Sequence, residues 1–177
     1  MIVTNSRYME RFIKEAAGEP LASHVRTVAL GVDTRLFTHG RRREARQILG
    51  LPQDRFIILT AASNIDDERK GLPLLIEALK GRTDLHDVVL VIIGWGKSIP
   101  ETPCEVRFTG YAQDERLVAL YFQAADIFVG PSKEEALGQT FIEAGACGTP
   151  SVAFNLGGIP DAVVDGVTGL LVEQRSA

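Results

Sequence analysis

Cysteine, histidine and long apolar runs are scarce in this chain of 177 residues. The two cysteines, Cys104 and Cys147, form no CxxC pair, so the sequence predicts free thiols rather than a zinc site or a disulfide framework. The three histidines are scattered and indicate neither a metal site nor a catalytic triad. The longest aliphatic run, residues 88–93, is far shorter than the roughly 20 residues that span a bilayer. No signal peptide pattern opens the chain, and we expect a cytoplasmic protein.

The charge of the chain limits its partners further. Nineteen Lys and Arg stand against 23 Asp and Glu, which gives a net charge of −4 and a pI of about 5.4. A bulk attraction to nucleic acid is therefore not expected. Hydrophobic residues make up 45% and charged residues 24% of the chain, as in ordinary globular proteins. Any phosphate site must be local and built from a few cations and backbone dipoles.

Short apolar runs alternate with helical patterns along most of the chain. Continuous apolar runs predict strands that are covered on both faces, and strands alternating with helices predict βαβ units around a parallel sheet. The predicted strands are residues 25–30, 56–62, 88–93, 106–109, 127–129, 151–154 and 169–172, and the predicted helices are about 41–49, 71–80, 113–124, 139–147 and 158–164. From residue 56 on, the pattern indicates a doubly wound, Rossmann-like α/β sheet of about six strands.

Residues 1–40 follow another pattern. Residues 1–4 resemble the end of a strand, Asn5-Ser6 is suited to cap a helix running to about Ala17, and residues 21–40 look like an extended connector. One strand and one helix cannot form a domain alone. We therefore expect residues 1–40 to be the end of an N-terminal domain plus an interdomain linker, and residues 41–177 to form the Rossmann-like domain.

The most informative stretch is residues 131–172. It holds two carboxylates eight residues apart, Glu135 and Glu143, with a glycine turn between them and very small residues after them. Free N–H groups and the helix dipole at such a helix start form an anion site, at the carboxyl end of a strand where open α/β sheets bind ligands. The pattern indicates phosphates held at the helix start, with flanking carboxylates bound to sugar hydroxyls. Alternatively, the acids only offset the helix dipole.

Several motifs in order resemble the family 4 retaining glycosyltransferases, the group 1 enzymes of the GT-B fold. The family's E-x7-E signature and the motifs after it appear as EALG, FIEAGACGTPSVAF and GGIPD. Its interdomain linker appears as VALGVDTRLF, its phosphate-binding segment as DERKGLPLLIEAL and its glycine turn as LVIIGWG, while TNSRYMERFIK matches the end of its N-terminal domain. The resemblance covers most of the chain and implies the C-terminal, nucleotide-sugar-binding half of such an enzyme.

The resemblance implies a role for each residue of the signature. Its first glutamate, Glu135, would contact the donor sugar, and its second, Glu143, would bind the nucleotide ribose. Backbone N–H groups of residues 137 and 138 would face the sugar or the β-phosphate, and those of the next two residues the α-phosphate. These four residues are Leu137, Gly138, Gln139 and Thr140.

A cationic turn precedes the predicted helix at 71–80. The family has a lysine here, matched by Lys70, and an arginine just after the preceding strand, where this chain reads Ala-Ser-Asn at residues 62–64. Arg69 is the candidate for the role of that arginine. The candidate catalytic residues are Lys70, Arg69 and Glu135. Lys70 and Arg69 would stabilise a departing diphosphate, and Glu135 would position the sugar. A solvated charged turn is the alternative, above all for Arg69.

Two more turns follow predicted strands. The turn Gly94-Trp95-Gly96 lacks the spacing of a dinucleotide fingerprint or a Walker A loop. Trp95 either lines a base pocket or covers the sheet. In the family, backbone at the level of Gly110 often hydrogen-bonds the nucleotide base, and Tyr111 either stacks on that base or packs as a turn aromatic.

The sequence thus predicts the donor-binding domain of a retaining glycosyltransferase that transfers a sugar from a nucleoside diphosphate sugar to a glycan or lipid hydroxyl, as in polysaccharide biosynthesis. No metal or other cofactor is expected. The acceptor would bind through an N-terminal domain outside this chain, the full-length enzyme could contact a membrane peripherally, and the chain alone would turn over little. The alternative is a non-catalytic nucleotide- or sugar-binding module, or a subunit that needs a partner.

Overall fold

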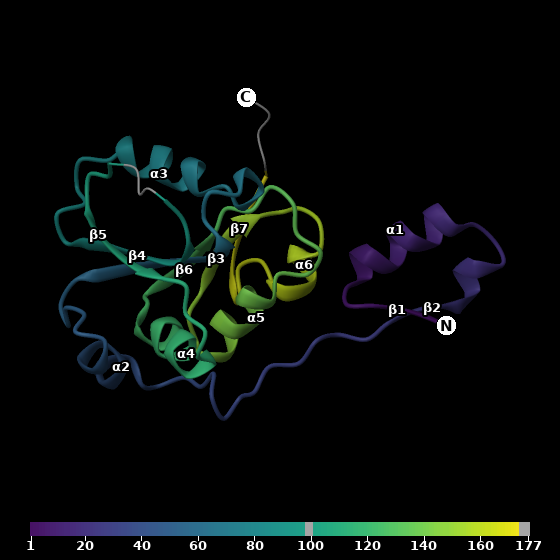
Figure 1. Ribbon diagram of the computed structural model, residues 1–177, viewed down its shortest axis with the longest axis horizontal. Coiled ribbons are helices and arrows are strands. Elements are labelled where there is room, and N and C mark those ends of the chain that lie inside the picture. The colour runs from purple at the N-terminus through teal and green to yellow at the C-terminus, as the bar shows by residue number, and fades with distance from the viewer. Residues whose placement is uncertain (98–100, 174–177) are drawn as a thin grey trace.

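A computed structural model of the protein describes residues 1–97 and 101–173. It consists of a larger α/β unit and a small N-terminal unit, joined by a stretch of extended chain (Figure 1). None of the helices in these ranges is long and apolar enough to cross a membrane.

Six parallel strands form the central sheet, in the order β5-β4-β3-β6-β7-β8. This order confirms the predicted doubly wound sheet. The strands β3 and β4 extend beyond their predicted ends. The bounds are β3 (Phe56–Asn64), β4 (Val88–Trp95), β5 (Glu105–Gly110), β6 (Ile127–Gly130), β7 (Ser151–Phe154) and β8 (Gly169–Val172).

Helices cover both faces of the sheet (Figure 1). Along β4, Val89, Val91 and Ile93 pack into one buried cluster with residues of α2, α4 and α5, while the alternate residues pack into a second cluster with α3. Because both faces are covered, the strand reads as a continuous apolar run. The helices are α2 (Arg42–Ile48), α3 (Leu72–Lys80), α4 (Glu115–Ala124), α5 (Gln139–Ala146) and α6 (Ile159–Ala162), with a 3₁₀ turn η2 (Glu68–Lys70) before α3.

The N-terminal unit comprises β1 (Ile2–Thr4), α1 (Arg7–Ala17), a 3₁₀ turn η1 (Leu21–His24) and β2 (Val25–Thr27). Ser6 caps α1 as predicted, because its hydroxyl accepts a hydrogen bond from the N–H of Met9 at 3.1 Å. The predicted strand at 25–30 is too long and lies outside the main sheet. It pairs in parallel with β1, which is only three residues long, so the pairing ends at Thr27.

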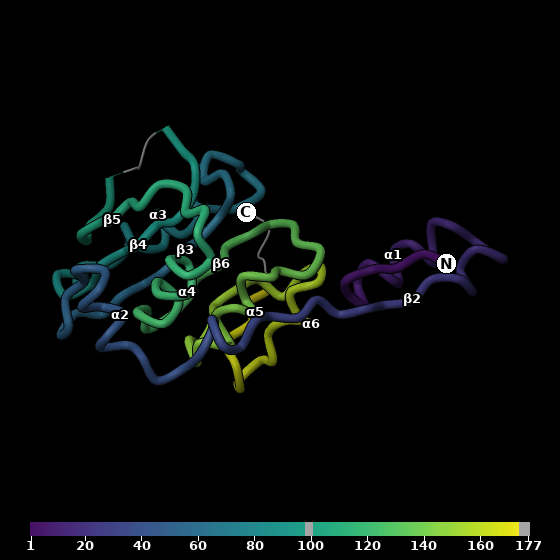
Figure 2. The backbone as a smooth tube through the Cα atoms, turned by 60° about the horizontal axis from the view of Figure 1, so that its bottom comes forward, coloured from purple at the N-terminus to yellow at the C-terminus, as the bar shows by residue number. Residues whose placement is uncertain are grey.

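An extended connector leads from β2 past α5 and α4 to α2 (Figure 2). The side-chain amide of Gln139 donates to the carbonyl of Gly31 at 3.1 Å, and that of Gln123 donates to the carbonyl of Leu36 at 3.0 Å. Phe37 is 5% exposed and enters the core. The connector is therefore held against α5 and α4 by these two hydrogen bonds and by the buried Phe37.

Arg46 of α2 is a buried cation that the sequence analysis did not single out. Its side chain is 4% exposed and pairs with the Asp126 carboxylate at 2.6 Å. The same carboxylate oxygen accepts the N–H of Ile57 in β3 at 2.7 Å. The other guanidinium N–H groups donate to the carbonyls of Pro52, Gln53, Arg55 and Ala124. This network fixes α2 to the amino ends of β3 and β6.

Candidate functional site

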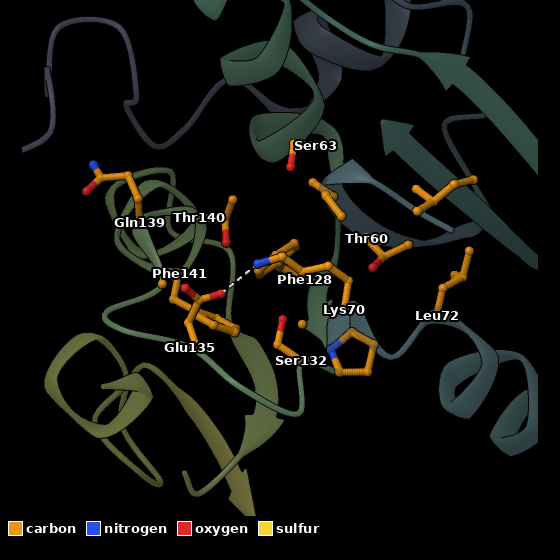
Figure 3. Close-up of a pocket in the computed structure, with 16 residues that line it drawn as sticks. Thr60, Ser63, Lys70, Leu72, Phe128, Ser132, Glu135, Gln139, Thr140 and Phe141 are labelled. Atoms are coloured by element: carbon orange, nitrogen blue, oxygen red, sulfur yellow. Dashed lines mark hydrogen bonds and ion pairs between the residues drawn. The ribbon is translucent and has the colours of Figure 1, made fainter. Parts of the chain in front are cut away.

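A cavity of about 210 Å³ opens at the carboxyl ends of β3 and β6 (Figure 3). The chain runs from β3 outward to β5 at one edge of the sheet and then returns to β6, which lies beside β3. The strand order therefore reverses between β3 and β6. Such a switch point is where doubly wound sheets bind ligands.

An ion pair between Lys70 and Glu135 lies in this cavity, with Nζ and Oε2 2.9 Å apart (Figure 3). The two side chains are 29% and 21% exposed. Lys70 ends η2, and Gly71 follows it with a φ of +70°. A Cβ at Gly71 would lie 1.9 Å from the carbonyl oxygen of Pro131, so only glycine lets η2 approach the loop after β6 this closely.

The start of α5 forms the opposite wall. Gly138 precedes the helix with a φ of +83°, and a Cβ there would lie 2.4 Å from the ring of Phe141. In the part of the chain that the structure describes, the N–H groups of Gln139 and Thr140 have no protein acceptor. Figure 3 shows the Thr140 side chain directed at Lys70, while Gln139 points away toward the connector. The helix start thus presents free donors and its positive dipole end to the cavity.

The loop that carries Glu135 is held from both sides. The N–H of Gly158 donates to the carbonyl of Glu135 at 2.8 Å, and a Cβ at Gly158 would lie 1.9 Å from the carbonyl oxygen of Ala136. On the other side, the Ser6 hydroxyl donates to the carbonyl of Ala136. The GGIPD motif and the N-terminal unit therefore set the position of Glu135.

Asp161, the last residue of that motif, caps α1. Its carboxylate accepts the N–H of Arg7 at 2.6 Å and that of Tyr8 at 3.3 Å. This role could not be predicted from the sequence, since the partners of Asp161 lie more than 150 positions away in the chain.

Glu143 lies outside the cavity, one turn into α5, and is half-buried. Burial and, as the smaller cause, the charge of Glu115 at the start of α4 together raise the pKa of its carboxyl group to about 7. Cys147, one turn on, is also buried, and burial together with the charge of Glu143 raises the pKa of its thiol to about 12. The two glutamates of the signature therefore occupy separate environments.

Arg69 does not line the first cavity. Its guanidinium binds the Asp67 carboxylate through two hydrogen bonds of 3.1 and 2.8 Å and faces a second cavity, described below. The side chain of Leu137 is buried at 4% exposure, so only its backbone is available to a ligand.

Trp95 and Tyr111 stack on each other at the ends of β4 and β5. Their ring centroids are 5.6 Å apart and their planes are 16° apart, while the residues are 62% and 46% exposed. Trp95 therefore does not cover the sheet. Gly110, which ends β5, has a φ of +72°.

Most of the other residues that line the first cavity were not predicted, because a strand end predicts the place of a site but not the side chains that form its walls. They include Thr60, Phe128, Ser132 and Phe141. Within residues 1–97 and 101–173, no group of three or more His, Cys, Asp or Glu side chains could hold a metal ion.

Comparison with known proteins decides the family. Residues 55–177 match the family model for glycosyl transferases group 1. The chain belongs to the group 1 glycosyltransferases. The predicted resemblance is confirmed, and the match takes in the Lys70–Glu135 pair and the α5 start.

Relatives share both sequence and fold with this group 1 chain. The D-inositol 3-phosphate glycosyltransferase of Actinosynnema mirum is 40% identical over 166 residues, which are 84% of this chain and 39% of that protein. The sucrose-phosphate synthase of Thermosynechococcus elongatus superposes with a TM-score of 0.80 at 29% identity, covering 98% of this chain and 45% of that one. Anabaena HepE, solved with UDP-glucose, shares the fold at a TM-score of 0.78, 22% identity, and coverage of 98% and 50%. The chain thus spans about two fifths of its curated relative.

Proposed function

We propose that this chain binds a nucleoside diphosphate sugar, as the donor half of a retaining glycosyltransferase. The Lys70–Glu135 pair, facing the start of α5 at the switch point, carries the proposal. An ammonium group and free helix N–H groups suit a diphosphate, and a carboxylate beside them suits sugar hydroxyls. The names of the relatives and the UDP-glucose bound by HepE support this choice of ligand.

The proposed reaction moves the sugar from phosphate to a hydroxyl. A bond forms between the acceptor oxygen and the anomeric carbon, and the bond from that carbon to the β-phosphate oxygen breaks. The nucleoside diphosphate leaves with the electron pair, and the acceptor proton passes to the departing phosphate. Lys70 and the first N–H groups of α5 stabilise the negative charge as it develops, while Glu135 positions the sugar.

The separate environments of the two glutamates fit a donor that wraps the start of α5. Its phosphates would lie at the N–H groups of residues 137–140, with the sugar at Glu135 and the ribose at Glu143. The base would then lie toward Gly110 and Tyr111 at the end of β5. A donor in this pose would contact Glu135 in the loop before α5 with its sugar, and Glu143 one turn into α5 with its ribose.

The acceptor is proposed to need further contacts. The relative from Actinosynnema mirum is about two and a half times as long as its aligned part, which supports an N-terminal domain that helps to bind the acceptor, with residues 1–27 belonging to its end. An acceptor anchored in lipid would bring such an enzyme to a membrane surface.

Thermal shift and calorimetry with UDP-, GDP- and ADP-glucose test the donor site. We expect one nucleotide series to stabilise the chain, and Lys70→Met to weaken that binding about tenfold or more, because a hydrogen bond to a charged group contributes roughly 1.5–3 kcal/mol. Lys80→Met, an exposed lysine of α3, is the matched control and should leave binding unchanged. If no diphosphate stabilises the folded chain, the proposal is wrong. Binding without transfer in a longer protein would favour the non-catalytic module.

A further inference from the structure

A second cavity adjoins the first and shares two of its residues. It has a volume of about 590 Å³, and Lys70 and Glu135 line both cavities. The remaining walls come from the start of α1, from Arg69 of η2, from the loop after β6 and from Leu156 and Gly157 after β7. Since Glu135 is the proposed sugar contact, the second cavity opens on the end of the donor where transfer occurs.

Hydrogen bonds fix the walls of this second cavity. The Ser6 hydroxyl binds the loop at Ala136, and the Asp161 carboxylate caps α1 by accepting the N–H groups of Arg7 and Tyr8. These contacts hold the first turn of α1 across from the loop that bears Glu135. The cavity is therefore an open cleft between the start of α1 and the Glu135 loop, and Arg69 and Lys133 are exposed along it.

Two cations lie side by side in it. The N–H of Lys133 donates to the carbonyl of Arg69 at 2.7 Å, which brings both side chains to the same wall. Among the described residues, no carboxylate pairs with Lys133, and Asp67 occupies Nε and Nη2 of Arg69 but leaves Nη1 without a partner. Glu134 lines the wall too, and Glu135 is already paired with Lys70. Besides the remaining N–H groups of Lys70, Lys133 and one edge of Arg69 are thus the cationic donors that this cavity offers to a ligand.

We propose that the second cavity receives the acceptor and that Lys133, with Arg69, binds an anionic group on it, a phosphate or a carboxylate. The inference rests on the proposed donor site, because Glu135 marks where the sugar would be. It moves Arg69 from the leaving diphosphate, its expected partner from the sequence, to the acceptor. A guanidinium edge beside an ammonium suits the several oxygens of a phosphate or carboxylate. The acceptor hydroxyl would then face the Lys70–Glu135 pair.

Amide NMR titration of the 177-residue chain tests this, with the first cavity saturated by the nucleoside diphosphate that binds best. The probes are glucose 6-phosphate, glucuronate and glucose, which differ mainly in charge. The two charged probes should shift the amide signals of Tyr8, Arg69 and Lys133, and glucose should not. Lys133→Met should weaken binding of the charged probes about tenfold, while the matched control Lys80→Met leaves it unchanged.

Three results would overturn the acceptor proposal. Glucose could bind as well as the charged probes, the charged probes could bind Lys133→Met as well as wild type, or the amide shifts could be confined to residues 139 and 140. If no nucleotide binds, the donor proposal fails and the acceptor assignment fails with it, whereas nucleotide binding without probe binding overturns the acceptor proposal alone. Vesicle flotation then separates two sources of the anion. Binding to phosphatidylinositol but not phosphatidylcholine vesicles, lost in Lys133→Met, assigns a lipid headgroup, and binding of the soluble probes alone assigns a soluble acceptor.

Discussion

Replacing Glu143 by glutamine is expected to stabilise the folded chain at pH 8 and to weaken its nucleotide binding. Burial on α5, with repulsion from Glu115, raises the pKa of Glu143 from 4.5 to about 7. A pKa change of that size corresponds to about 3 kcal/mol. Solvent still reaches part of the carboxyl group, so we expect a smaller effect. At pH 8, the free energy of unfolding of Glu143→Gln should exceed that of wild type by ~1–2 kcal/mol.

The direction of the pH effect follows from proton binding. Between pH 4.5 and 7 the folded chain keeps a proton on Glu143 that the unfolded chain has lost. The stabilisation is therefore present at low pH and is lost as the pH rises through the folded-state pKa. Wild type should lose ~1–2 kcal/mol relative to Glu143→Gln between pH 5 and pH 8. Urea unfolding of both proteins measures this difference, and the subtraction cancels the groups that titrate equally in both.

A constant stability difference between the two proteins at pH 5 and pH 8 would refute the reasoning. Glu115→Gln provides a further check, since it should lower the midpoint of the pH dependence without abolishing it, burial being the larger cause. If Glu143→Gln also weakens nucleotide binding while the protein becomes more stable at pH 8, the acid contributes to binding at a cost in stability, as expected of a functional site.

Three more substitutions test the packing around the site. Gly138→Ala puts a Cβ 2.4 Å from an α5 ring at positive φ, and its melting temperature should fall by several degrees more than that of Gly50→Ala, whose Cβ meets open space; equal losses would exclude the steric contact. Arg46→Met should lower the free energy of unfolding in urea by ~3–5 kcal/mol, and a loss no larger than that of exposed Arg43→Met, about 0.5 kcal/mol, would contradict the network. Ser6→Ala should cost ~1 kcal/mol of helix-capping free energy and so speed amide hydrogen exchange in the first turn of α1 about fivefold. Unchanged exchange would show that the cap is dispensable.

Local patterns in the sequence predict most of the fold, because each has a local physical cause. The apolar run of β4 is continuous since both faces of the sheet are covered, and Gly138 precedes α5 because the backbone there needs a positive φ. Lys70 and Glu135 follow strand ends, and strand ends meet at one edge of a parallel sheet. For these reasons the sequence predicts both the sheet and the core of the first cavity.

Contacts between distant segments could not be predicted in the same way. Arg46 and Asp126 are 80 positions apart, and Asp161 caps a helix that starts 154 positions earlier. No periodicity in the sequence encodes such pairs, so nothing in the sequence distinguishes the buried Arg46 from an exposed arginine. The second cavity could not be predicted for the same reason, since its walls come from α1, η2 and the loops after β6 and β7.

The shared ion pair links the two proposed binding events. An ammonium group has three N–H donors, and Glu135 takes one of those of Lys70 at 2.9 Å. In the proposed complex, Lys70 could therefore bind a phosphate oxygen without releasing Glu135, and the bond to Lys70 would hold that carboxylate in place for the sugar. Either single substitution would leave a partly buried charge without its partner, which mixes lost binding with lost stability. The double variant Lys70→Met, Glu135→Gln removes both charges at once, so affinity that it loses beyond the stability change reflects the ligand contacts themselves.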